Sequence, residues 1–205
     1  MVKIIWQDKA IGGFPVAIDG VDQTVGKSTT TNEPASVSAE IMYELPEKWT
    51  VENNNNRICN RILVFQKTGT TSKDSLEKAA ASGKGELLAR ALDIGNRLDE
   101  RLSESLKRSR IVDFRTISKG SGSAFGGQQQ QQVYYEFDVV GSDEGSRTAD
   151  PYYYLVSATI LPLKKRLYVF ILEGNNNILS QSDKFDRRNI LQQLRSSFTV
   201  VQQVD

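Results

Sequence analysis

The sequence contains no histidine and only one cysteine, Cys59, among its 205 residues. Histidine is the commonest general acid–base near neutral pH and the commonest side-chain metal ligand. Its absence excludes Ser-His-Asp and Cys-His hydrolases, and zinc sites that combine His with Cys. A single cysteine cannot form an intrachain disulfide. Because Cys59 stands just before an apolar run, we favour a packed small side chain over a reactive thiol.

The chain also lacks a strong net charge and a long apolar run. Lys and Arg number 26 against 25 Asp and Glu, a formal net charge of +1. Domains that bind nucleic acid usually carry a clear basic excess, so we expect no nucleic-acid partner. No apolar run approaches the roughly 20 residues of a membrane-spanning helix, so we expect no membrane insertion. The first residues resemble neither a signal peptide nor a transit peptide, which predicts a cytosolic protein or a mature chain whose targeting segment was removed.

Glycine, proline and short polar tracts interrupt every periodic pattern in residues 1–40. We therefore predict an extended N-terminal arm over 1–40, followed by one domain over 41–205. Residues 1–50 carry 4 Lys and 7 acidic residues, a net of −3, which leaves 22 basic and 18 acidic residues, a net of +4, for the remainder. The arm is too apolar for a solvated linker, with Trp6, Ile11, Phe14 and Val16. These residues either dock on a partner or fold back onto their own domain, and we favour docking.

Alternating and helical hydrophobic patterns define the elements of the predicted domain. Short β-favouring runs predict strands at residues 41–49, 57–67, 111–118, 133–140, 152–161 and 167–172. Apolar spacings of three and four predict one long helix over Glu86–Leu106, and a polar connection with capping residues precedes it at Thr70–Glu77. A final helix is predicted to begin near Ser182 or Asp183, with a short extension at Val200 and Val201.

Short connections between the later strands imply hairpins and therefore antiparallel pairing. With amphipathic helices on its faces, such a sheet predicts an α+β fold, an α/β/α sandwich with a central antiparallel sheet. The connection between the last two strands carries Lys164, Lys165 and Arg166. These cations either steer the protein toward acidic loops of membrane proteins or are ordinary solvated charges of a hairpin tip. The glycine-rich residues 120–127 lack the Lys-Ser/Thr ending of a phosphate-binding loop, so we predict no nucleotide site there.

Four groups of residues occur in an order that is shared with one known family. The first is the YELPEKW segment at 43–49, and the second is LVF at 63–65 followed by TSKDSL at 71–76. The third comprises YYEF at 134–137, LVSATI at 155–160 and RLYVF at 166–170, and the fourth is LQQLRSSFTV at 191–200. In this order and spacing they resemble the PsbP-like proteins of the thylakoid lumen, which include the extrinsic subunit of photosystem II. Runs of Asn or Gln at 53–56, 128–132 and 175–177 indicate a divergent member, such as one from an alga.

The resemblance implies a non-enzymatic extrinsic subunit of the chloroplast thylakoid lumen that binds and stabilises a photosystem, most simply photosystem II near its oxygen-evolving side. Its partners would be the photosystem membrane-protein complex and other extrinsic subunits, with the protein peripheral to the membrane. The alternatives are an assembly or repair factor of the same family, an accessory subunit of photosystem I, and an unrelated protein-binding domain of similar architecture, such as the Ran-binding nuclear transport factor.

Metal binding is the family property that the residues support least. Calcium belongs to the oxygen-evolving setting, but the family's best-known metal contact uses a histidine, which this chain lacks. The carboxylates of Asp99, Glu100 and Glu104 lie on one predicted helix and lack the dense Asp/Asn/Gly loop of a cation cage. We therefore expect no metal site, no cofactor and no catalytic residue.

Overall fold

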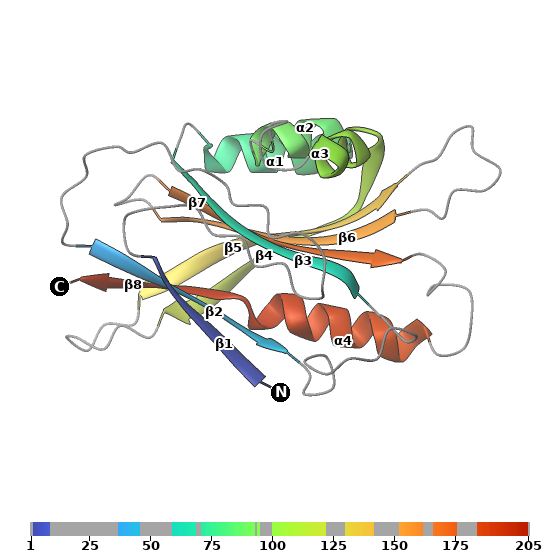
Figure 1. Ribbon diagram of the computed structural model, residues 1–205. Coiled ribbons are helices and arrows are strands. Elements are labelled where there is room, and N and C mark those ends of the chain that lie inside the picture. The colour runs from blue at the N-terminus through green and yellow to red at the C-terminus, as the bar shows by residue number, and fades with distance from the viewer. Residues whose placement is uncertain are drawn as a thin grey trace.

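A computed structural model of the protein describes residues 2–8, 37–45, 59–68, 71–92, 94, 100–121, 130–141, 152–161, 166–175 and 184–204. Eight strands and four helices lie in these ranges (Figure 1). The strands are β1 (Val2–Asp8), β2 (Val37–Leu45), β3 (Cys59–Thr68), β4 (Ser109–Ser121), β5 (Gln130–Gly141), β6 (Tyr152–Leu161), β7 (Arg166–Asn175) and β8 (Thr199–Val204). The helices are α1 (Lys73–Ser82), α2 (Gly85–Ala91), α3 (Glu100–Lys107) and α4 (Lys184–Ser197).

The main sheet has five strands in the order β3-β7-β6-β5-β4, and every neighbouring pair is antiparallel. The predicted hairpin pairing of the later strands is confirmed, and the mixed α+β class is confirmed with it. All six predicted strands fall on described strands. Groups of strands and groups of helices follow one another along the chain. The hydrophobic pattern has a period of two residues in the strands and of three to four residues in the helices.

Both faces of this sheet are covered by apolar side chains. Helices α1, α2 and α3 lie over one face, and α4 lies on the opposite side with β2 and β8 (Figure 1). Strand β5 shows how alternation divides the two cores, since Tyr135 and Phe137 belong to the core under α1–α3 and Tyr134 belongs to the core facing α4. In the second core the rings of Phe170 and Phe198 stack with centroids 5.0 Å apart, which anchors the end of α4.

The N-terminal region differs from the prediction of an extended arm. Strand β1 pairs antiparallel with β2, with Val2 opposite Leu45 and Asp8 opposite Ala39. Strand β2 pairs in turn with β8, which gives a second, three-stranded sheet in the order β1-β2-β8. The predicted boundary between residues 40 and 41 therefore falls inside β2 and is not a structural boundary. Residues 9–36 lie outside the described residues.

The single long helix predicted over 86–106 is wrong, because α2 ends after Ala91 and α3 begins at Glu100. The amide of Ile94 donates to the carbonyl of Ala89 at 3.0 Å, a six-to-one bond that closes a helix end. The apolar spacing of three and four continues across this break because both helices face the same core, which contains Leu88, Leu102 and Leu106. Because α2 and α3 pack on one core, their apolar residues keep the same spacing of three and four, and the sequence pattern alone could not separate the two helices.

Helix α1 begins with a capping box. The Ser72 hydroxyl accepts from the amide of Ser75 at 3.2 Å, and the Ser75 hydroxyl accepts from the amide of Ser72 at 3.2 Å. The Ser75 hydroxyl thus satisfies the Ser72 amide, and the Ser72 hydroxyl adds a second acceptor for the Ser75 amide, which also donates to the Ser72 carbonyl at 3.1 Å. We expect Ser72→Ala to lower the free energy of unfolding by about 1 kcal/mol in urea denaturation. Ser196→Ala, at an exposed position in α4, is the control, and equal effects of the two changes would contradict the role of the cap.

Candidate functional site

The seven residues predicted to dock on a partner do not come together in the described part of the chain. Ile11, Phe14 and Val16 lie outside the described residues, as do Lys164 and Lys165. Trp6 lies in β1, opposite Ile41 and two residues along from Ile4, which is opposite the buried Tyr43. The docking role of Trp6 stays a prediction.

Arg166 is not a solvated charge of a hairpin tip. It is the first residue of β7, opposite Leu161 of β6 and Thr68 of β3, and only 6% of its surface is exposed. The interpretation as a steering cation is therefore wrong for this residue. The apolar run that follows it carries the strand into the centre of the sheet, and Arg166 is buried with that strand.

The most unusual chemical feature of the described chain is a cluster of buried charges between β5 and α4. Its centre consists of Glu136, Asp138 and Arg195, each 1% exposed or less. The Arg195 guanidinium lies 3.2 Å from a Glu136 carboxylate oxygen and hydrogen-bonds to Asp138 and to the carbonyl of Phe137. The Tyr153 hydroxyl donates to the second Asp138 oxygen at 3.0 Å. One arginine thus pairs with two buried carboxylates that lie two residues apart on the same face of β5.

Two further cations connect this centre to the edge of the sheet. Arg115 on β4 donates to Glu136 at 2.8 Å, and the Lys119 ammonium lies 4.0 Å from the same carboxylate. Lys119 also donates to the carbonyls of Ser196 at 2.7 Å and Phe198 at 2.8 Å, where α4 ends. A cation at a helix C-terminus satisfies carbonyls that have no partner within the helix. The cluster therefore fastens α4 to the sheet at several points.

The position of Lys119 predicts a specific pH dependence of stability. Burial lowers the pKa of Lys119 from 10.5 to about 8, although the Glu136 carboxylate acts in the opposite direction. Between these two values the unfolded chain binds more protons than the folded chain, so the contribution of Lys119 to the free energy of unfolding increases with pH. Burial raises the pKa of Tyr134, whose ring lies under this ammonium, to about 12, so Tyr134 stays protonated over most of that range.

We expect the difference in unfolding free energy between the wild type and Lys119→Met to grow in favour of the wild type as the pH rises above about 8. Urea denaturation of both proteins at several pH values up to about 9.5 measures this difference, and other titrating groups cancel in the comparison. A difference that stays constant or falls with rising pH would show that Lys119 is not buried as described.

Sequence reasoning missed this cluster, although the pattern contains a signal for it. Glu136 and Asp138 alternate with Phe137 in a strand that is otherwise apolar, so two carboxylates share one face. Arg195 occupies a position between Leu191, Leu194 and Phe198 on the apolar face of the last helix. Charged residues at core positions of two elements indicate that the elements pair, because buried charges require partners.

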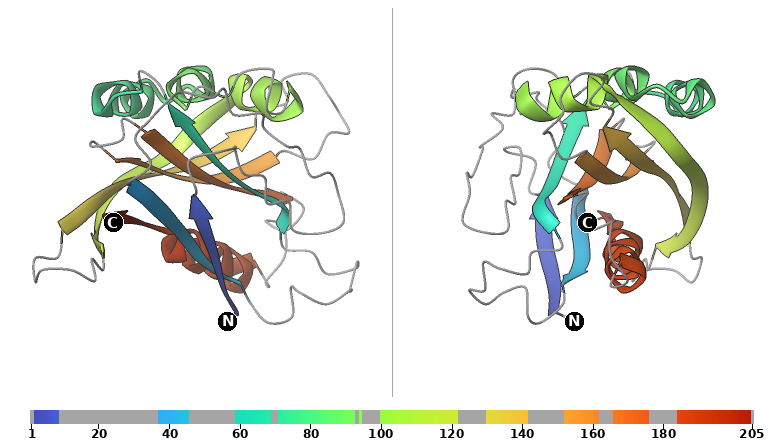
Figure 2. Two further views of the ribbon diagram at one scale, coloured as in Figure 1. Left: turned by 60° about the vertical axis from the view of Figure 1, so that its left-hand side comes forward. Right: turned by 90° about the vertical axis from the view of Figure 1, so that its right-hand side faces the viewer.

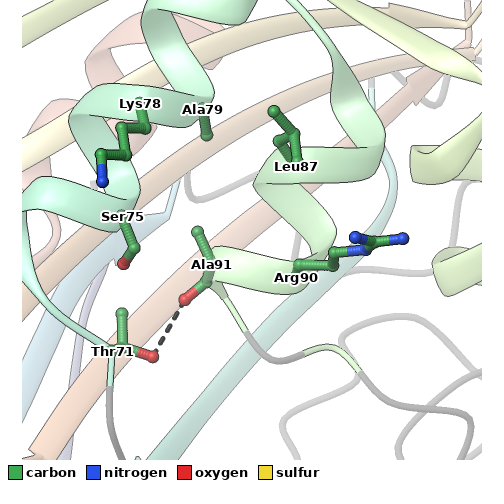
Figure 3. Close-up of a pocket in the computed structure, with 7 residues that line it drawn as sticks. All are labelled: Thr71, Ser75, Lys78, Ala79, Leu87, Arg90 and Ala91. Carbon is green, nitrogen blue, oxygen red and sulfur yellow. Dashed lines mark hydrogen bonds between the residues drawn. The ribbon is translucent and has the colours of Figure 1, made fainter.

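A surface groove between α1 and α2 is the second candidate (Figure 3). It has a volume of about 430 Å³ and is lined by Thr71, Ser75, Lys78, Ala79, Leu87, Arg90 and Ala91. Two of its polar groups have partners within the chain: the Thr71 hydroxyl donates to the carbonyl of Ala91 at 2.9 Å, and Arg90 donates to Glu86 at 2.6 Å. In Figure 3 the Lys78 and Arg90 side chains extend away from each other. Nothing in this groove selects a particular ligand.

Among the described residues, no group of three or more His, Cys, Asp or Glu side chains could hold a metal ion. Of the three carboxylates considered from the sequence, Glu104 forms an ion pair with Lys107 at 2.7 Å, and this contact lowers the pKa of Glu104. Asp99 and the side chain of Glu100 lie outside what is described. In the part of the chain that the structure describes, no helix combines the length and apolar character needed to cross a membrane.

No family model matches the sequence, and no curated protein matches it.

Proposed function

We propose that this protein is a PsbP-like α/β/α sandwich that acts as a non-enzymatic extrinsic subunit on the lumenal side of photosystem II. The observation that carries the proposal is the ordered set of four sequence similarities. Their key residues lie in the two cores, including Tyr43 of β2, Leu76 of α1 and Phe198 after α4. Sequence similarity at core positions of successive elements supports a similarity of the whole fold, and not only of an isolated motif.

A binding role accords with how the described chain uses its charged groups. The innermost carboxylates, Glu136 and Asp138, are closed to solvent and paired with Arg195. These buried charges therefore hold α4 against the sheet and are not exposed to a substrate. A rigid scaffold suits a protein that holds a surface against a larger complex, since little ordering is required on binding.

The pairing of β1 with β2 makes it possible to test whether residues 9–36 contribute to docking or to folding. Asp8 lies opposite Ala39, so the described residues on either side of this segment are close together. A short Gly/Ser linker in place of residues 10–35 removes Ile11, Phe14 and Val16 and preserves the pairing of β1 with β2. Deleting residues 1–35 is the comparison, because it removes β1 as well.

If residues 9–36 dock on the partner, the linker variant is expected to lose at least about tenfold in affinity for salt-washed photosystem II membranes while keeping its melting temperature. The deletion of residues 1–35 is expected to lower both. A linker variant with unchanged affinity and a lower melting temperature would contradict docking and support the alternative, in which this segment folds onto its own domain.

A further inference from the structure

Strand β4 is the terminal strand of the five-stranded sheet. One of its sides pairs with β5, and along the other side the described residues contribute a single bridge, between Lys84 and Arg110, next to a bond from the amide of Ile111 to the carbonyl of Gly83 at 2.8 Å. The right view of Figure 2 shows β4 at the outer margin of the sheet, below the helical layer. Between this bridge and the Lys119 contact with α4, the described chain supplies no neighbouring strand. Such an edge presents backbone donors and acceptors that can pair with another strand.

A β-bulge on this edge exposes an apolar side chain. Ile111 is opposite Val139 and Asp113 is opposite Asp138, so Val112 is the additional residue in β4. A bulge redirects the side chain of the additional residue. The Val112 side chain is 47% exposed, and it is the exposed large apolar residue among those that the structure describes. Val112 therefore gives this edge an apolar contact point beside the Lys84–Arg110 bridge, where the described residues supply no further partner strand.

Positive charge surrounds the start of this edge. Lys84 is joined to Arg110 by the bridge, and both residues are exposed, as are Lys107 and Arg108 in the preceding turn. Glu104 contacts two of these cations, 2.7 Å from Lys107 and 4.0 Å from Arg108, and the exposed Asp113 follows Val112 on β4 itself. Among the described residues around the start of β4, the four cations outnumber these two carboxylates, which favours an acidic partner and speeds its association.

The backbone under these cations is held firmly. Gly83 ends α1 with φ of +67°, a left-handed conformation that glycine adopts readily. Gly85 packs so tightly that a Cβ there would lie 2.1 Å from the carbonyl oxygen of Leu106 and 2.7 Å from that of Ser109. The turn that carries Lys84 is thus fixed against the beginning of β4, and an incoming strand meets a surface that is already ordered.

We propose that the open edge of β4 binds an extended acidic segment of a partner protein, which adds to the five-stranded sheet as a further strand beginning beside the Lys84–Arg110 bridge. Backbone hydrogen bonds along residues 112–118 supply the pairing, as in other cases of strand addition. Val112 supplies an apolar contact, and the cations at the start of β4 select acidic side chains. This inference deepens the proposed function by naming the surface and the chemistry of its partner, and it rests on that function only for the partner's identity.

The first test uses a model ligand and does not depend on the photosystem. A peptide of about eight alternating Glu and Val residues is compared with a matched peptide of alternating Lys and Val, by hydrogen exchange of the β4 amides. The acidic peptide is expected to slow exchange in residues 112–118, and the basic peptide is expected to have no effect. No protection by the acidic peptide, or equal protection by both, would overturn the proposal.

The second test uses variants of the edge. Val112→Glu and Arg110→Glu change exposed side chains, so we expect their melting temperatures to stay close to that of the wild type. Each is expected to weaken binding of the acidic peptide, and of photosystem II membranes, by about tenfold. Lys78→Glu, a charge reversal at an exposed position of α1, is the matched control and is expected to bind as the wild type does.

The outcomes separate the two proposals. If the wild type binds the membranes and both edge variants bind them equally well, the strand-addition proposal fails while the proposed function stands. If the acidic peptide binds in an edge-dependent way and the wild type does not bind the membranes, the proposed function fails while the strand-addition surface stands.

Discussion

Replacing Arg195 with methionine is expected to lower the free energy of unfolding by about 3–5 kcal/mol, because it leaves the buried carboxylates of Glu136 and Asp138 without their central cation. The residue is fully buried, so solvent cannot compensate for the lost charge. Denaturation by urea measures the effect. Arg108→Met, at an exposed position, is the control and is expected to change stability by less than about 0.5 kcal/mol.

Neutralising the two carboxylates distinguishes unpaired charge from loss of packing. The triple variant Arg195→Met, Glu136→Gln, Asp138→Asn removes the central charges together and keeps the side-chain shapes on β5. We expect it to be more stable than Arg195→Met alone, since replacing a buried ion pair costs less than breaking it. A triple variant less stable than the single one would show that Arg195 acts through packing alone.

Gly85→Ala is expected to destabilise the protein by about 3 kcal/mol, since the added Cβ would lie 2.1 Å from the backbone oxygen of Leu106. This oxygen belongs to α3 and cannot rotate away as a flexible side chain can. Helix α2 would have to move away from α3 and from the start of β4. The melting temperature and the chemical denaturation midpoint measure the loss.

Gly174→Ala is the matched control for this change. A Cβ at Gly174 would meet its nearest neighbours at 3.5 Å and 3.6 Å, which is ordinary contact. We expect this substitution to leave stability unchanged or to raise it by up to about 1 kcal/mol, because alanine restricts the unfolded chain. Equal losses from both substitutions would contradict the close approach of α2 and α3.

The strands of the main sheet were predictable because each carries its own alternation of apolar residues. Helix α4 was predictable because its apolar residues fall on one helical face. The short extension after it was also predicted, although β8 continues to Val204. Strand β1 was not predictable from the sequence. The glycine- and proline-rich stretch after it obscures its apolar run, and its pairing depends on a strand about 30 residues away. The break between α2 and α3 was hidden because one core serves both helices.

The candidate surfaces depended still more on tertiary structure. Arg195 meets Asp138, 57 residues away, and no local pattern states that α4 packs on β5. The exposure of Val112 results from a bulge in the pairing of β4 with β5, and strand alternation alone gives no sign of it. The buried position of Arg166 likewise follows from its pairing on both sides, whereas its sequence suggested a charged turn.

The proposed role as an extrinsic subunit is tested most directly by cross-linking intact thylakoids of the source organism and identifying the neighbours of this chain by mass spectrometry. We expect cross-links to lumenal segments of photosystem II core proteins, with the chain retained in a near-stoichiometric amount in the purified complex. Recovery only with immature complexes or with photosystem I would support the family's other roles. Recovery in cytosolic or nuclear fractions, with no photosystem neighbour, would contradict the account.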